Sequence, residues 1–217
     1  EEVKSLVYKW FGDTLSAGIQ TKKLPPEPPQ SEARQDYSSA KVPMDAIYKA
    51  YHMPAKGTLG YIATDLVSDL LGRGKSSRFY QRLVKKKEIF NSISASITGS
   101  HDPGLLVISG KVNPGITLQD AENYLLDEIE DFKVSLHEEE VEKVVNQAES
   151  AHYFTETELM NKALALANSA ALGKTNLVNV ELDQILHITR EELLVQANRV
   201  LIPSNSSTLY YSSNSNS

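Results

Sequence analysis

Apolar residues recur at spacings of three and four in several parts of the chain. This pattern predicts helices over 1–11, 58–71, 118–132 and 189–201. The same periodicity runs from 137 to 173. A helix of about 35 residues is long for a globular domain, so we expect a kink or break near Phe154 and Thr155.

Runs rich in β-branched and aromatic residues predict the strands. They cover 46–53, 89–98, 105–112 and 207–211. The second and third runs are separated by turn-forming residues at 99–104, so we expect them to form a hairpin. The predicted fold class is α+β, with a mainly antiparallel sheet covered by helices.

The glycine-rich stretch GRGKSSRFY, residues 72–80, joins two predicted helices. We expect Gly72 to end the first helix in a left-handed conformation, and Ser76 or Ser77 to cap the second. The second helix then has an apolar face made of Phe79, Tyr80, Leu83 and Val84. Its opposite face carries a basic stripe of Arg78, Arg82 and Lys85 or Lys86, which we interpret as solvated and paired with acidic helices.

The residues Gly74, Lys75 and Ser76 also match the end of a phosphate-binding P-loop. That loop needs a glycine where Asp69 stands, and it must follow a strand rather than a helix. We therefore favour a simple turn, and nucleotide hydrolysis is kept as a third alternative.

Proline-rich sequence at 24–30 divides the chain, because proline lacks the amide donor that regular structure needs. We expect 1–30 to be the terminal helix of a preceding domain followed by a linker. The main domain is then 31–211, and the serine- and asparagine-rich residues 212–217 form a disordered tail.

The chain has 217 residues, no cysteine and a formal net charge of −6. The acidic balance argues against nucleic-acid binding, and no apolar run reaches the roughly 20 residues that span a membrane. Lack of cysteine excludes disulfides and thiolate metal sites but fits either the cytoplasm or the periplasm. The charge is uneven, since residues 120–158 contain thirteen acids and two lysines.

His137 opens the sequence HEEEV, which is close to the zinc motif H-x-x-E-H. Val141 stands where the second histidine must be, so we interpret this stretch as a solvated helix start. The remaining histidines are single, and no local pattern marks a nucleophile with its base. We predict no metal site and no catalytic residue in this chain.

Several short motifs together resemble one known family. They are YHMP at 51–54, DLVSDLLG at 65–72, KSSRFYQRL at 75–83, DPGL at 102–105, VNPG at 112–115, NQ at 146–147 and SSTLY at 206–210. In combination they are similar to the inactive domain of the pitrilysin/insulinase family of zinc metallopeptidases. The resemblance covers about residues 40–211.

The resemblance implies a metallopeptidase half-domain of the processing-peptidase type. In this family a preceding domain carries zinc, and the second domain helps to enclose the peptide substrate. The expected partners are thus a zinc-bearing domain, in the same chain or a partner subunit, and a peptide. No cofactor is expected in this chain, and the parent protein is expected to be a zinc endopeptidase.

The same resemblance gives candidate contacts with the substrate or the partner domain, namely Arg78, Arg82, Val84, Lys85 and Asn91. Second halves that complete an active site often carry arginine and tyrosine where Val84 and Asn91 stand here. This difference suggests an internal domain, a half whose chemistry is completed elsewhere, or an inactive complex. The alternative function is a scaffold subunit of processing-peptidase or respiratory-core type.

Overall fold

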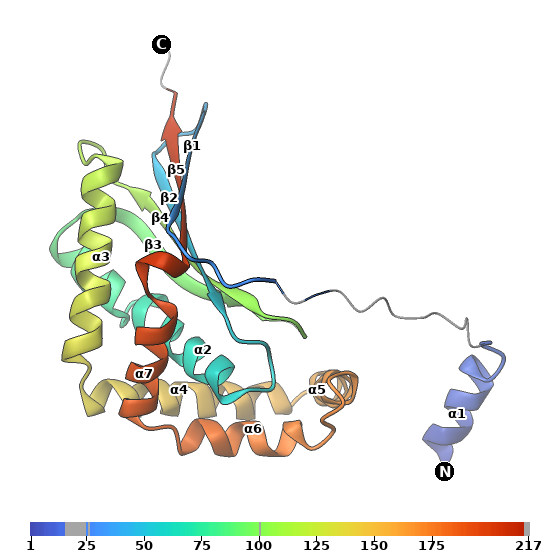
Figure 1. Ribbon diagram of the computed structural model, residues 1–217. Helices are drawn as coiled ribbons and strands as arrows, with labels where there is room; N and C mark the ends of the chain where they lie inside the picture. Colours follow the sequence, from blue (N-terminus) through green and yellow to red (C-terminus); the bar gives the residue numbers. More distant parts are fainter. Residues whose placement is uncertain (16–24, 26, 100, 215–217) are drawn as a thin grey trace.

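The computed structural model describes residues 1–15, 25, 27–99 and 101–214. Its strands are β1 (Arg34–Ala40), β2 (Ala46–Met53), β3 (Phe90–Thr98), β4 (Gly104–Val112) and β5 (Ser206–Ser213). Its α-helices are α1 (Glu2–Phe11), α2 (Leu59–Gly72), α3 (Leu118–Ser135), α4 (Glu138–Glu156), α5 (Leu159–Ala171), α6 (Leu177–Leu186) and α7 (Arg190–Val200). A π-helix, η1 (Phe79–Lys86), and a 3₁₀ turn, η2 (Pro203–Asn205), complete the chain. Helix α1 lies apart from the rest (Figure 1).

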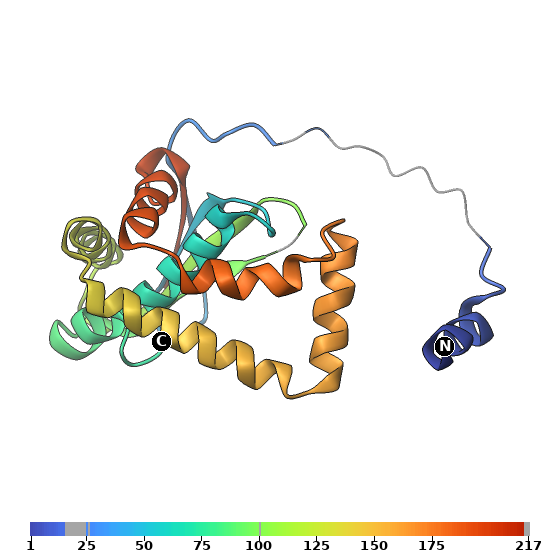
Figure 2. The ribbon, with the colours of Figure 1, turned by 90° about the horizontal axis from the view of Figure 1, so that it is seen from below.

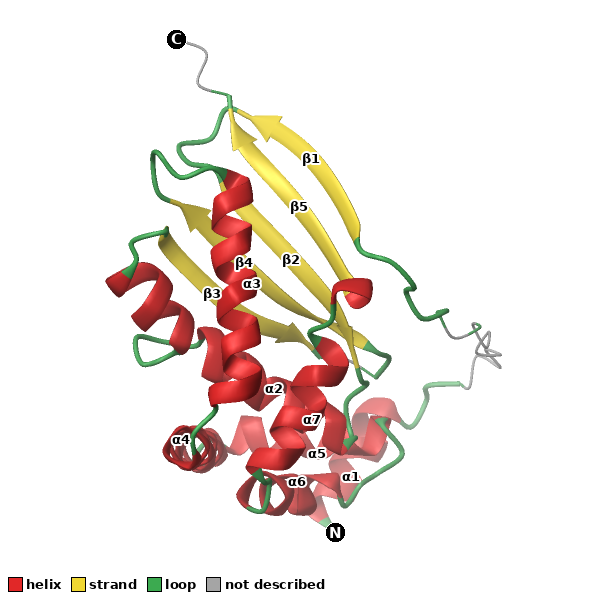
Figure 3. Cartoon of the chain, turned by 60° about the vertical axis from the view of Figure 1, so that its left-hand side comes forward, coloured by secondary structure: helices red, strands yellow, loops and turns green. Residues whose placement is uncertain are grey.

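The five strands form one sheet in the order β1-β5-β2-β4-β3 (Figure 3). The β1–β5 pair is parallel and every other pair is antiparallel, which confirms the predicted α+β class. Strand β1 was not predicted, because its sequence RQDYSSA has no apolar alternation and it stays almost wholly exposed. Backbone pairing with β5 rather than burial therefore holds it in place.

Strand β5 runs to Ser213, beyond the predicted end at 211. Ser212 and Ser213 therefore belong to the sheet rather than to the expected tail, because they pair with Ser39 and Ala40 of β1. The last three tail residues, 215–217, lie outside the described residues, as do 16–24 and 26 of the expected linker.

The core lies between one face of the sheet and helices α2, α3 and α7. Alternate residues of β2, including Ile47 and Tyr51, point into it. Helix α3 contributes Leu125, Ile129 and Phe132, which are each at most 1% exposed. Burying one such side chain stabilises the fold by about 1.5–3 kcal/mol, so this layer supplies much of the driving force.

A buried polar network crosses the same interface. The ammonium of Lys49 donates to Glu122 Oε1 at 2.9 Å and to Thr208 Oγ1 at 2.7 Å, and Tyr210 donates to the other Glu122 oxygen. Burial by itself raises the pKa of Glu122, but the hydrogen bonds from Tyr210 and Lys49 outweigh it and hold that pKa below its usual value. Tyr37 of β1 stacks on Tyr210, with ring centroids 4.7 Å apart. The network thus ties β2, β5 and α3 together.

Most predicted helices are confirmed. The long periodic stretch breaks where expected, since α4 ends at Glu156 and α5 begins at Leu159. Thr117 caps α3 by accepting from the Asp120 amide at 3.0 Å. Helix α6 was missed although Val178, Leu182 and Ile185 stand at helical spacing, and the helix buries only Leu177.

The turn at GRGKSSRFY differs from the prediction in two respects. Gly72 is the last residue of α2 and is not left-handed, whereas Gly74 has a φ of +75°. No serine caps the next helix: η1 follows Arg78, and Ser77 Oγ donates back to the Gly74 carbonyl at 2.7 Å. Gly72 is needed for another reason, because a Cβ there would lie 2.1 Å from the Ala95 nitrogen of β3.

Alanine substitutions can distinguish the roles of Gly72 and Gly74. We expect Gly72→Ala to lower the free energy of unfolding by about 3 kcal/mol or more, since the backbone of β3 cannot yield easily. Gly74→Ala should lower it by only about 1 kcal/mol, the cost of a left-handed alanine in open space. Urea unfolding of both variants measures the difference, and equal losses would contradict the close-approach explanation.

Candidate functional site

The candidate contact residues lie on η1 and at the start of β3. Helix η1 has i+5 hydrogen bonding, shown by the Lys87 amide bonding to the Arg82 carbonyl at 3.0 Å. Glu88, which follows it, has a left-handed φ of 54°. π-Helices and left-handed non-glycine residues are both uncommon and are found often at functional sites. The junction between η1 and β3 is therefore a candidate functional site.

Arg78 is buried, which corrects its expected place on a solvated basic face. Its guanidinium donates to both carboxylate oxygens of Glu140, at 2.8 and 2.6 Å. It also donates to the Ser135 side chain at 2.9 Å and to the Ser135 carbonyl at 2.7 Å, and it lies over the Phe132 ring. Only 5% of the Arg78 side chain is exposed, so it joins η1 to α3 and α4 and does not face a ligand.

Arg82 lies one turn further along and is partly exposed. It pairs with Asp131 and with Glu128, whose Oε1 is 3.2 Å from the Arg82 nitrogen. Glu128 Oε1 nevertheless accepts no hydrogen bond with acceptable geometry. Burial raises the pKa of Glu128, and the nearby arginines only partly offset this. The pair lines a polar cavity of about 400 Å³ between η1 and α3.

The other three candidates behave differently. Val84 is half-buried and packs against the core, while Lys85 and Asn91 are exposed. Asn91 is the extra residue of a β-bulge, because Phe90 pairs with Val112 and Ser92 with Lys111. A bulge redirects a side chain and often adjoins a functional surface. Of the five candidates, Arg78 is therefore buried, Arg82 and Val84 are partly buried, and Lys85 and Asn91 are exposed at the junction between η1 and β3.

A second surface is the face of the sheet that the helices leave uncovered. On β3 the exposed positions include Ser92, Ser94 and Ser96, which alternate with inward-facing residues. Towards the centre of the sheet, Tyr48 of β2 is 43% exposed. Figure 1 shows the sheet nearly edge-on, with the helices packed on one side and below. This face is broad, largely uncharged and rich in hydroxyl groups.

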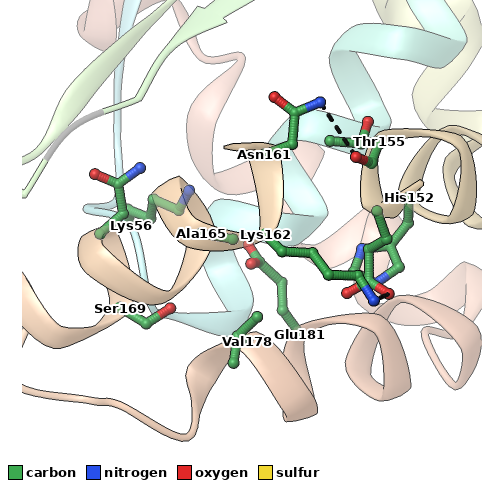
Figure 4. A pocket seen from close by; sticks show the side chains of 11 residues that line it. Lys56, His152, Thr155, Asn161, Lys162, Ala165, Ser169, Val178 and Glu181 are labelled. Atoms are coloured by element: carbon green, nitrogen blue, oxygen red, sulfur yellow. Dashed lines mark hydrogen bonds and ion pairs between the residues drawn. The ribbon is translucent and has the colours of Figure 1, made fainter. Parts of the chain in front are cut away.

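An acidic cavity of about 240 Å³ lies between α2, α4 and α6. Asp65 and Asp69 enter it from α2, Glu181 from α6 and His152 from α4. Burial, together with repulsion from Asp69, raises the pKa of Asp65 to about 6. A smaller cavity of about 110 Å³ shares His152 and Glu181 and continues towards α5 (Figure 4).

The two motifs weighed in the sequence have structural roles. Residues 74–76 lie in a turn between two helices, where the Lys75 and Ser76 carbonyls accept hydrogen bonds from Gln81 and Lys143. His137 precedes α4, and its amide donates to Glu140 Oε2 at 3.1 Å. Among the described residues, no group of three histidine, cysteine, aspartate or glutamate side chains is arranged to hold a metal ion. No helix in the described part of the chain is long and apolar enough to cross a membrane.

Sequence reasoning missed the uncovered face and the acidic cavity. The alternation of serine with isoleucine and alanine at 92–97 is a signal that could have revealed the face. Asp65 and Asp69 are one turn apart on the predicted helix α2, but the third carboxylate comes from α6, which was not predicted. The cavity therefore could not be assembled from the sequence.

The role of Arg78 can be tested against an exposed arginine. Arg78→Met should lower the free energy of unfolding by about 3 kcal/mol, because it leaves partly buried carboxylates without their partner. Arg73, which is 68% exposed and pairs with Asp69 at 2.9 Å, is the matched control. Arg73→Met should change stability by less than about 1 kcal/mol. Similar losses in denaturant unfolding would refute an anchoring role for Arg78.

Asp65 should make stability depend on pH. Because its pKa is about 6 when folded and near 3.9 when unfolded, the folded state takes up the proton first as pH falls. The free energy of unfolding should therefore rise by on the order of 1–2 kcal/mol relative to Asp65→Asn between pH 7.5 and 5. Urea titrations of both proteins measure this difference. Asp127→Asn, at an exposed position, is the control, and a wild-type profile that matches Asp65→Asn would show the inference to be wrong.

Several proteins of known structure share this fold. A protease from Helicobacter pylori aligns with a TM-score of 0.90 at 21% identity, over 97% of this chain and 52% of its own. An inactive peptidase domain from Bordetella parapertussis aligns at 0.72 with 22% identity, over 80% of this chain and 94% of its own. The first half of the periplasmic protease PqqL from Escherichia coli aligns at 0.76 with 15% identity, over 98% and 49%.

These likenesses establish the fold, and the chain spans about half of the H. pylori protease. A comparison with curated protein sequences found no match. The model of one family, described as the peptidase M16 inactive domain, matches residues 1–148. That match covers most of the chain and agrees with the resemblance seen in the motifs. The chain belongs to the peptidase M16 inactive-domain family.

Proposed function

We propose that this domain is the non-catalytic half of a zinc metalloendopeptidase. It forms part of the wall of a chamber that encloses a peptide, beside a zinc-bearing domain that is not in this chain. The zinc and the catalytic residues belong to that partner. The observation that carries the proposal is the uncovered sheet face, which meets the η1–β3 junction where Asn91 is exposed.

The chemistry of this face suits peptides of varied sequence. Hydroxyl groups such as those of Ser94 and Ser109, 3.2 Å apart, can both donate to and accept from a peptide backbone. Strand β3 ends the sheet and contains no charged residue, so its outer edge is compatible with an extended segment. Neither feature selects a particular side chain of the peptide. A chamber wall that accepts peptides of varied sequence needs this lack of selectivity.

The residues at the junction favour a supporting role. Val84 is held against the core, so it does not reach outwards. Asn91 is exposed but neutral, so it can form hydrogen bonds and brings no positive charge to the junction. These two positions also support the second candidate, a scaffold subunit of processing-peptidase or respiratory-core type without proteolytic activity.

Zinc binding and proteolysis separate these functions. The 217-residue chain alone should neither retain zinc after dialysis nor cleave a peptide library. Joined to its zinc-bearing partner, it should support cleavage that is lost when the glutamate of the partner's H-x-x-E-H motif is replaced by glutamine. Zinc-dependent cleavage by the chain alone would overturn the proposal. Absence of an H-x-x-E-H motif both upstream in the parent sequence and in a neighbouring gene would favour the scaffold.

A further inference from the structure

Helix α5 has its polar and apolar faces reversed. A surface helix normally buries its apolar stripe and exposes polar residues. In α5 the residues that turn inwards are Asn161, Ala165 and Ser169, and Ser169 is the one residue of the helix that is buried. They line the small polar cavity shown in Figure 4, with Asn161 donating to the Thr155 carbonyl at 3.1 Å.

The outward side of α5 is apolar. Leu159 is 83% exposed, Met160 68%, Leu164 53% and Leu166 55%. Phe154, at the end of α4, adds an aromatic ring that is 78% exposed. We call these five residues the α5 stripe. Single exposed apolar residues are ordinary, but a contiguous group of this kind marks an interaction surface.

Resting on the proposed function, we infer that the α5 stripe packs against the zinc-bearing domain that precedes this one in the parent protein. The occupant is an apolar helical surface of that domain. This assigns the contact between the two halves to α5, away from the hydroxyl-rich sheet face.

The exposed apolar residues of α1 support this occupant. Its exposed apolar residues follow helical spacing as the α5 stripe does, with Val3, Val7 and Trp10 between 52% and 74% exposed. If α1 is the last helix of the preceding domain, as the sequence suggests, that domain carries exposed apolar helical surface of the kind that the α5 stripe would cover.

The length of a solved relative supports the same occupant. The H. pylori protease aligns over 97% of this chain, but that alignment takes up only 52% of its own length. Such a protein has a second half of similar size, which can supply the covering surface. A second copy of this chain is a less suitable occupant, because it carries the same net charge of −6 and its acidic α4 adjoins the stripe.

Photo-crosslinking in the full-length parent protein tests the inference. A benzoylphenylalanine at position 164 should form crosslinks to the preceding domain within the same molecule, identified by peptide mass spectrometry. The same probe at Val134 of α3, which is 78% exposed, is the matched control and should form none. A third probe at Asn91 tests the proposed chamber face independently.

Each outcome is decisive. Crosslinks from 164 only to another molecule, or none from 164 while 91 reaches the preceding domain, would overturn the inference and leave the proposed function standing. Absence of crosslinks from both positions would overturn both. In addition, Met160→Lys with Leu164→Lys should leave the unfolding midpoint of the 217-residue chain unchanged within error. In the parent it should split a single unfolding transition into two, whereas a retained single transition would contradict the contact.

Discussion

The buried guanidinium of Arg78 is the interaction on which the arrangement of surfaces depends. It bonds Glu140 of α4 and Ser135 at the end of α3, so three elements meet at one side chain. Burial alone raises the pKa of Glu140, but the bond from Arg78 reverses this and keeps the carboxylate charged. Because η1 is fixed in this way, the strand that follows it begins at a defined point. The bulge at Asn91 and the exposed edge of β3 are then set by the anchor behind them.

A sheet covered on one side has two kinds of surface to offer a partner. Its uncovered face presents neutral hydroxyl groups, which form many exchangeable hydrogen bonds and bury little apolar area. The α5 stripe presents Leu164 and its neighbours, whose burial gives a stable, largely non-directional contact. The first suits a substrate that must enter and leave, and the second suits a domain that stays attached. The fold keeps them apart by placing α4, α5 and α6 below the sheet in Figure 1, the side that faces the viewer in Figure 2.

The sequence predicted those elements whose burial is visible as periodicity. Helices α2 and α3 and the β3–β4 hairpin were found because each buries a regular apolar set. Strand β1 and helix α6 were not, since β1 is held by backbone pairing and α6 buries only Leu177. Of the candidate contacts, Lys85 and Asn91 are exposed, and their contact with a substrate or partner domain stays a prediction. The expected pairing of the basic stripe with acidic helices is confirmed for Arg78, but its burial was not predicted, because its acidic partners lie more than fifty residues away in sequence.

Helix α6 lies beside both the acidic cavity and the helix that carries the α5 stripe. It brings Glu181 towards Asp65, and it lines the small cavity that the inward side of α5 faces. Protonation of Asp65 near pH 6 removes its repulsion from Asp69 on the same helix and, to a smaller extent, from Glu181 of α6. The same Glu181 also lines the small cavity behind the polar side of α5, so the acidic cavity and the inward side of α5 share a wall.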